Sequence, residues 1–339
     1  MSKNAIRSAA VLVAALVAAP AVATAQSPVT CTVTGPQGVR GYAADACQKA
    51  TDLFTFVMPQ FAQALSGGGA IIGSANTLGG LGKFSFNVRV NAVDGVIPDI
   101  DDIRLNAAGA RQSTLTTRKS PVPAPAVDVG VGVFNGFPVG RTRMLSVDGI
   151  VNVAYLPDVD VEGLKVVVPG ERLKLGYGGR VGITRDGPKI PAISASYIRR
   201  ELPTADITAE FEGGSGGTDQ LSLTAFTVST EALRLSISKK LAFLEIGGGV
   251  GRDTYETRLN IGAIVSEAGL TGSAATSFTQ NVTRDIAYVS AALNLPLFKL
   301  SAEVGQAQGG TTLTTFNTIA DADNDKPRRF ASAGIRISF

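Results

Sequence analysis

The sequence contains few groups that could carry out acid–base or nucleophilic chemistry. It has no histidine and only two cysteines. Catalysis by Ser–His or Asp–His dyads needs an imidazole to carry the proton, so these common hydrolytic mechanisms are excluded. We therefore expect no enzymatic activity and no cofactor.

Two acidic clusters could offer oxygen ligands to calcium. The first contains Asp99, Asp101 and Asp102, and the second contains Asp321, Asp323 and Asp325. Their spacing suits Ca²⁺, but neither cluster has the glycine and the distal glutamate of an EF-hand loop. We interpret both as solvated outer loops and predict no metal site, with calcium binding as the open alternative.

The two cysteines, Cys31 and Cys47, are predicted to form a disulfide. A metal site is the weaker alternative, because two thiols without histidine make a poor tetrahedral ligand set. The disulfide requires an oxidising compartment, and the start of the chain indicates export. Positive charges at Lys3 and Arg7 precede an uncharged apolar run, and the small residues before Gln26 fit signal-peptidase cleavage after Ala25.

A glycine-rich segment, Ser66–Gly82, reads SGGGAIIGSANTLGGLG. It is too rich in glycine for a stable helix and too apolar for a free linker, so we expect it to pack closely inside another structure. It lacks both the Gly-Lys-Ser/Thr ending and the GxGxxG pattern of phosphate-binding loops. We interpret it as a plug or a periplasmic segment, with these glycines as candidate gate residues: Gly67, Gly68, Gly69, Gly79, Gly80 and Gly82.

Residues 43–65, just before this segment, follow a helical period whose apolar stripe is interrupted by Pro59, which predicts one helix, either straight or kinked there. From Lys83 onward the pattern alternates with period two, as in Phe84 to Val90 and Val127 to Val133, and this is typical of strands with one apolar and one polar face. About ten such strands can be counted. The region from Ile103 to Leu115 could add strands, which leaves 12–14 as the alternative.

The last strand ends on an aromatic residue at the carboxy-terminus. Its polar-x-Gly-x-x-apolar-x-aromatic pattern resembles the terminal assembly signal of bacterial outer-membrane β-barrels. The matching positions are Ser332, Gly334, Ile337 and Phe339. We therefore predict an all-β fold, a transmembrane antiparallel β-barrel at residues 83–339. It follows a signal peptide at 1–25 and a segment at 26–82 that contains the disulfide, the helix and the plug.

Outer-membrane barrels have short periplasmic turns and longer outer loops, with both termini in the periplasm. Counting back from Phe339, the outer loops are predicted at 94–125, 156–172, 213–218, 256–283 and 308–327. Polar side chains on the inward faces are candidate lumen residues. They are Arg89, Asp128, Asp148, Lys174, Arg180, Arg234, Lys299, Glu303 and Arg336. Their mixed signs suit salt-bridged filling as well as a conduction path, and Glu303 is the nearest candidate partner for Arg336.

The order of signal peptide, plug-like segment and tall barrel is similar to that of the long-chain fatty acid and hydrocarbon transporter family. The stretch from Gly176 to Gly182 and on to Arg199-Arg200-Glu201-Leu202-Pro203 also resembles uncharacterised outer-membrane protein families. The first resemblance implies transport of an apolar molecule. The second implies no function.

Our leading hypothesis is a monomeric outer-membrane barrel that passes or binds a small hydrophobic molecule. The alternative is a structural or surface-contact barrel with a sealed lumen. A formal net charge of +3 gives no basic excess for nucleic acid. The expected partners are outer-membrane lipid, the barrel-assembly machinery and a small apolar ligand.

Overall fold

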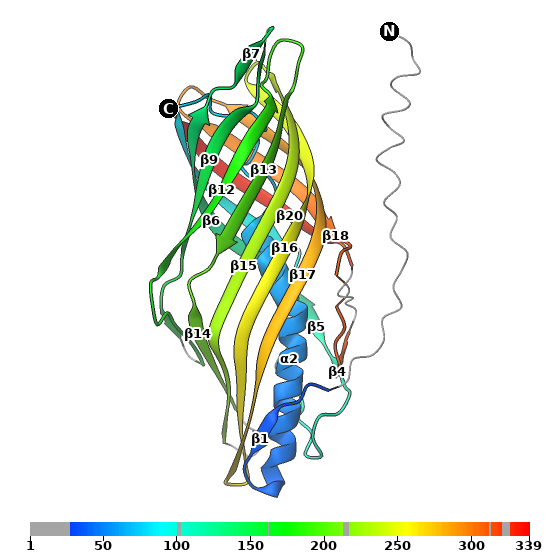
Figure 1. Cartoon of the computed structure of the whole chain (residues 1–339). Coiled ribbons are helices and arrows are strands. Elements are labelled where there is room, and N and C mark those ends of the chain that lie inside the picture. The colour runs from blue at the N-terminus through cyan, green and yellow to red at the C-terminus, as the bar shows by residue number, and fades with distance from the viewer. Residues whose placement is uncertain are drawn as a thin grey trace, which may run out of the picture.

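The computed structural model describes residues 28–99, 103–140, 142–161, 163–212, 217–311, 313–320 and 326–339. The predicted signal peptide lies outside these residues. The chain forms a tall barrel with one long helix in the half opposite the carboxy-terminus, and this half narrows toward β1 (Figure 1). The elements are β1 (Thr32–Thr34), α2 (Gln37–Ser66), β2 (Phe84–Val93), β3 (Val96–Pro98), β4 (Thr114–Leu115), β5 (Thr117–Lys119), β6 (Val122–Phe134), β7 (Phe137–Val139), β8 (Thr142–Met144), β9 (Ser146–Tyr155), β10 (Val159–Val161), β11 (Leu164–Val167), β12 (Leu173–Thr184), β13 (Ala192–Glu201), β14 (Ala205–Glu212), β15 (Thr218–Leu241), β16 (Leu244–Glu267), β17 (Leu270–Asn294), β18 (Lys299–Gln308), β19 (Thr318–Ile319) and β20 (Arg328–Ser338).

Ten antiparallel strands close into a ring, which confirms the predicted barrel. The order around the ring is β2, β6, β9, β12, β13, β15, β16, β17, β18 and β20, and β20 pairs back onto β2. The ring closes between the first and last barrel strands. There the rings of Phe84 and Phe339 stack with centroids 4.6 Å apart, and the two residues exchange backbone hydrogen bonds. The short strands β3, β4, β5 and β19 pair outside this ring.

Strand β13 pairs with the periplasmic half of β15, with Ile193 opposite Ile237 and Tyr197 opposite Leu233. The chain leaves this ladder at Pro203, which separates β13 from β14, because proline cannot donate to the ladder.

The predicted outer loop at 256–283 is wrong. Strands β16 and β17 continue through this region and turn at Ala268-Gly269, so each strand is more than twice as long as a membrane crossing requires. Their apolar faces change sides part of the way along. On β16, Ile246 and Val250 face outward, whereas Leu259 and Ile261 are buried on the inner face.

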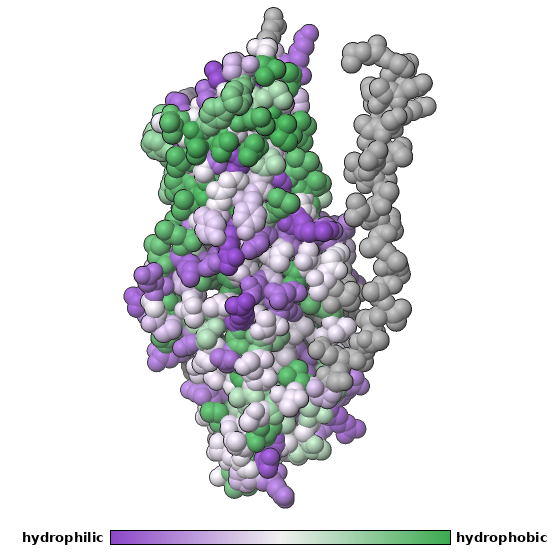
Figure 2. Space-filling model, viewed as in Figure 1, coloured by the Kyte–Doolittle hydropathy of each residue, from purple (hydrophilic) through white to green (hydrophobic). Residues whose placement is uncertain are grey.

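This change of side marks the outer edge of the membrane-spanning part. Between this edge and the end that carries Phe339, apolar side chains point toward lipid. Between this edge and the end that carries β1, they point inward and the outer face is polar. Figure 2 shows the apolar belt around one end of the molecule and a polar band next to it. An exposed ion pair between Arg252 and Asp285, 2.8 Å apart, lies just above Val250 on β16 and Ala287 on β17.

Helix α2 fills the part of the barrel that extends beyond the membrane. It is longer than the predicted 43–65, and it continues through Pro59 as one helix, as expected. Its apolar residues Phe54, Met58 and Leu65 belong to one buried cluster with residues of β16 and β17 such as Leu259 and Phe278. We call α2 together with the outer halves of β15, β16 and β17 the outer head.

The expectation that both ends of the chain lie in the periplasm is also wrong. The short turns lie at the same end of the barrel as Phe339, which makes that end periplasmic. Strand β1 instead pairs with β17 near the tip of the outer head, with Thr32 opposite Ala275. The chain therefore runs through the barrel from the outer end to the periplasmic end before it starts β2 (Figure 1).

Candidate functional site

The glycine-rich segment lies inside the barrel. Helix α2 ends at Ser66, and Gly67 turns the chain with a φ of 64°, which few other residues adopt. Residues 67–75 are all buried, and the chain leaves the lumen at Lys83, beside the Phe84–Phe339 pair. We call residues 67–82 the plug.

The candidate gate glycines are most closely packed at the end of the plug that follows helix α2. A Cβ atom on Gly67 would lie 2.9 Å from the side chain of Asn91, and one on Gly68 would lie 1.8 Å from Oε1 of Glu303. The Gly69 Cβ position is 3.0 Å from Glu303. At the periplasmic mouth, Gly79 and Gly80 lie against Arg185 and Asn135, while Gly82 faces open space.

Three of the buried ion pairs in the lumen join neighbouring strands. They are Arg89 with Asp128 (3.2 Å), Arg180 with Asp148 (2.7 Å) and Arg234 with Asp253. In a water-poor interior such pairs are stable only if further hydrogen bonds satisfy the remaining donors. The plug supplies at least one acceptor to each arginine, although Nε and Nη2 of Arg89 have no hydrogen-bond partner within the described chain.

Each of the three arginines also donates to a plug or helix-end carbonyl. Arg234 donates from Nε to the oxygen of Gly68 (2.8 Å), and Arg89 donates to Gly69 (3.0 Å). Arg180 donates to the oxygen of Ser74 (3.1 Å). These residues therefore bind the plug to the wall and leave no open conduction path along their side chains.

The other candidate lumen residues differ in their placement. Glu303 accepts the Gly69 N–H at 3.0 Å, and Lys299 pairs with Glu245 at 2.5 Å. The predicted pair between Arg336 and Glu303 is wrong, because Arg336 lies opposite Lys299 in the register and forms no ion pair within the described chain. Lys174 is exposed at the outer rim, 3.4 Å from Glu201.

Three buried charged residues of the lumen were not predicted from the sequence: Asp253, Arg200 and Glu245. Asp253 lies three residues after the outward-facing Val250, and Arg200 lies three residues after the outward-facing Tyr197. The period-two alternation of a strand therefore places both on the inner face, and following it further along the sequence would have found them. Arg200 lies 3.7 Å from Asp128, and its Nε and Nη2 atoms have no hydrogen-bond partner within the described chain.

A wide groove of about 1140 Å³ lies on the lipid-facing side of the wall. It lies in the outer part of the apolar belt and is lined by residues of seven strands, β2, β13, β15, β16, β17, β18 and β20. Its apolar lining includes Leu235, Val250, Val289, Val304 and Ala331, and Gln306 and Arg329 lie at its outer edge.

The wall between this groove and the plug is thin. A small cavity of about 10 Å³ lies on the plug side, and Ser236, Ile237, Gly248 and Tyr288 line both spaces. That volume is just enough for one water molecule. The Tyr288 hydroxyl lies 2.6 Å from the Ser236 hydroxyl across the inner face. The plug residues Gly73, Ser74 and Ala75 line the other side of the cavity.

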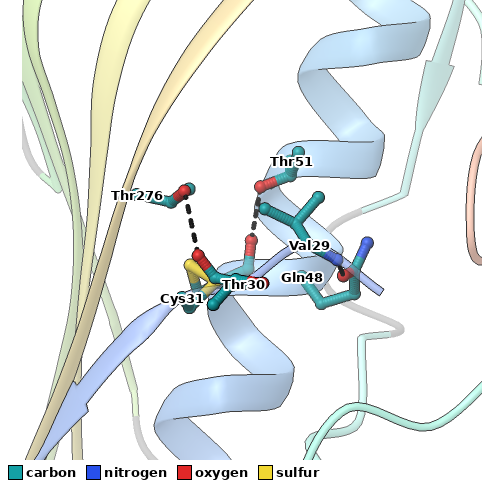
Figure 3. Close-up of a disulfide and its surroundings, with 7 residues drawn as sticks. Val29, Thr30, Cys31, Gln48, Thr51 and Thr276 are labelled. Atoms are coloured by element: carbon teal, nitrogen blue, oxygen red, sulfur yellow. Dashed lines mark hydrogen bonds between the residues drawn. A yellow bond between two sulfur atoms is a disulfide. The ribbon is translucent and has the colours of Figure 1, made fainter. Parts of the chain in front are cut away.

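The predicted disulfide is confirmed, and it fixes the amino-terminal strand to the helix. Cys31 and Cys47 are bonded, with Cα atoms 6.5 Å apart. Figure 3 shows hydrogen bonds beside it from the Val29 N–H to the Gln48 side chain (2.6 Å) and from the Thr276 hydroxyl to the Thr30 carbonyl (3.5 Å). The disulfide therefore joins the start of β1 to α2, and the ladder between β1 and β17 connects both to the tip of the outer head.

The acidic clusters are described only at Asp99, and the remaining five aspartates lie outside the described residues. Across the described ranges, no group of three or more potential ligands is placed to hold a metal ion. The same residues contain no helix with the length and hydropathy of a membrane-spanning segment.

Three features define this fold as an outer-membrane β-barrel. The antiparallel ring is closed, its outer face carries an apolar belt, and short turns lie at the end that carries the terminal phenylalanine. No protein-family model matches the sequence, and no curated protein does.

Solved structures show only distant likeness. Ail, the attachment invasion locus protein of Yersinia pestis, is 10% identical, with a TM-score of 0.28 over 76% of this chain and 99% of that one. The beta domain of the Bordetella autotransporter BrkA is 12% identical, with a TM-score of 0.33 over the same shares. OmpT, an outer membrane protein of Vibrio cholerae, is 9% identical, with a TM-score of 0.17 over 76% of this chain and 98% of that one.

Proposed function

We propose that this outer-membrane barrel binds a small hydrophobic molecule in the lipid-facing groove and passes it inward past the plug. The observation that carries this proposal is the position of the groove. Barrel walls are usually convex toward lipid, whereas this wall is hollowed across residues of seven strands and lined mostly by apolar and small residues.

The thin wall behind the groove supports the second half of the proposal. The groove and the inner cavity share Gly248 and Tyr288, and plug residues line the far side of that cavity. The described lumen is otherwise filled by the plug, as expected for a ring of ten strands, because open aqueous channels need about sixteen. Passage therefore requires that the plug move away from the wall.

The chain has no tryptophan, so a single introduced tryptophan reports on binding. Ala331 lines the groove, and Ala333 lies two residues further along the same outward face of β20 but outside the groove. In nanodiscs, a dibrominated fatty acid should quench Ala331→Trp saturably at low concentration. Quenching of Ala333→Trp should only follow partition into the lipid.

A blocking substitution separates binding from partition. Ala287→Phe fills the groove and should abolish the saturable component of Ala331→Trp quenching. Ala291→Phe, on the same face of β17 but outside the groove, should leave it unchanged. Equal, non-saturating quenching of both reporters would refute groove binding.

One observation favours the alternative, a surface-contact barrel. Strands β15, β16 and β17 have 24, 24 and 25 residues, which is far more than the membrane requires, and they carry a packed head outside it. A contact function predicts that proteoliposomes bearing the protein cluster in a turbidity assay, and that protease treatment of the heads disperses them.

A further inference from the structure

The outer head contains a second hollow, which is separate from the lipid-facing groove. This cleft, of about 490 Å³, lies between α2, the loop at 103–105 and the outer ends of β14, β15 and β16. Its apolar surface is formed by residues such as Leu53, Leu221 and Val265. Because this part of the molecule lies beyond the apolar belt, the cleft faces water.

The helix side of the cleft is rigid. Lys49 is buried and pairs with Asp45, and its Nζ donates to the carbonyl of Arg104 at 2.8 Å. Asp45 also accepts the N–H groups of Asn106 (2.8 Å) and Arg111 (3.2 Å). These bonds fix the loop onto the helix, and the nearby disulfide fixes the helix to β1. The positive charge of Lys49 is therefore already neutralised, and Arg104, the second cation that lines the cleft, belongs to this loop on the helix side.

The opposite rim carries three carboxylates without a cation. Glu210 and Glu212 belong to β14, and Asp219 begins β15. Within the described chain none of them forms an ion pair. Glu210 accepts only the amide of Gln220 at 3.5 Å, and Asp219 accepts the Ser266 N–H at 2.9 Å. An apolar floor beside an unneutralised acidic rim complements a ligand with an apolar body and a positive end.

We propose that this cleft binds a small amphipathic cation, with its alkyl part between α2 and β15 and its positive end at the Glu212–Asp219 rim. The site is independent of the lipid-facing groove, and the two can fail separately. A purely apolar ligand would gain nothing from the carboxylates, and an amphipathic anion would be repelled by them.

The test uses the whole protein in nanodiscs and isothermal titration with three six-carbon probes: hexyltrimethylammonium, hexanol and hexanoate. Hexyltrimethylammonium should bind with the highest affinity, and empty nanodiscs supply the background. Glu212→Gln together with Asp219→Asn keeps the shape of both side chains but removes two charges. The affinity for the cation should fall about tenfold, because two opposite charges at the rim are lost; this corresponds to about 1.4 kcal/mol.

The matched control removes two exposed carboxylates outside the cleft, by Asp160→Asn and Glu171→Gln, and should leave the affinity unchanged. Equal loss in this control would show a general surface-charge effect and refute the site. Equal binding of hexanol and the cation, or no binding of the cation to the unmodified protein, would also refute it. All substitutions are nearly isosteric, and retained heat-modifiable migration of the folded barrel verifies that each variant is folded.

Discussion

At the scale of single residues, Arg234 connects the wall, the neighbouring strand and the plug. Its guanidinium pairs with Asp253 and donates to the carbonyls of Gly67 (3.1 Å) and Gly68 (2.8 Å). Asp253 is fully buried and also accepts the Ser66 hydroxyl at 2.8 Å. Loss of the arginine would leave a buried carboxylate without a counter-charge.

We predict that Arg234→Met lowers the free energy of unfolding by about 3–5 kcal/mol, the usual cost of breaking a buried ion pair. Arg252→Met is the control, because it removes an arginine from an exposed pair on the neighbouring strand, where the expected cost is below about 1 kcal/mol. Urea titration of the refolded barrel measures both. Similar losses in the two variants would show that burial does not determine the effect.

Phe339 is the second residue whose role can be tested. It stacks on Phe84 where the ring closes, and it matches the terminal assembly signal. We predict that Phe339→Glu sharply reduces the amount of membrane-embedded, heat-modifiable protein in cells. Phe137→Glu, at an exposed aromatic on a periplasmic hairpin, should have a smaller effect. Normal assembly of the Phe339 variant would refute the signal.

At the scale of elements, the disulfide determines whether the outer head is complete. It closes a loop of about fifteen residues, which contributes roughly 3 kcal/mol on the chain-entropy model. We predict that Cys31→Ala with Cys47→Ala leaves the membrane-spanning part folded but increases hydrogen exchange in β1 and the first turns of α2. Exchange in β2 and β20 serves as the internal control. Unchanged protection of α2 would show that packing alone holds the helix.

The element scale also shows what the sequence could and could not reveal. Alternation identified the membrane-spanning strands, because Val88 or Leu235 facing lipid requires a polar residue on either side. The same rule failed at 256–283. There the apolar side chains of Leu259 and Ile261 are on the opposite face, so the apolar positions move from one face of the strand to the other near Arg252. A search for strands whose apolar side chains change faces, instead of for strands that end, would have predicted the outer head.

For the candidate site, the sequence supplied the residue types but not the partners. The alternation placed Arg89, Arg180 and Arg234 on the inner faces, and the structure buries all three. The pairing of Arg234 with Asp253 depends on strand register, and the bonds of all three arginines to plug carbonyls depend on the path of residues 67–82. The groove could not be predicted, since it arises from the curvature of seven strands.

At the scale of the whole molecule, the path of the plug determines how transport can be tested. Residues 67–82 span the distance from the outer head to the periplasmic mouth. Their deletion would shorten this connection, so α2 would have to move into the lumen. A reversible lock is a sharper test. The hydroxyls of Thr77 and Ser146 lie 2.6 Å apart, which places a disulfide between Thr77→Cys and Ser146→Cys within reach.

We predict that oxidation of this double variant stops uptake of a fluorescent fatty acid into proteoliposomes, and that dithiothreitol restores it. The unmodified protein with and without dithiothreitol controls for reduction of the native disulfide. Saturable quenching at Ala331→Trp should persist in the locked state, because the groove lies outside the ring. Uptake that is equal in the locked and reduced states would exclude plug movement.

The threading of the chain also has a mechanical consequence. The barrel closes by joining its first strand to its last, around a segment that begins with a helix of 30 residues packed against the outer halves of β16 and β17. A pull on β1 from outside the cell would first load the β1–β17 ladder and the packing of α2, because β1 pairs with β17 and the disulfide ties it to the helix. The arginine–carbonyl contacts of the plug would bear force next, and the ladder between β2 and β20 only after these had broken.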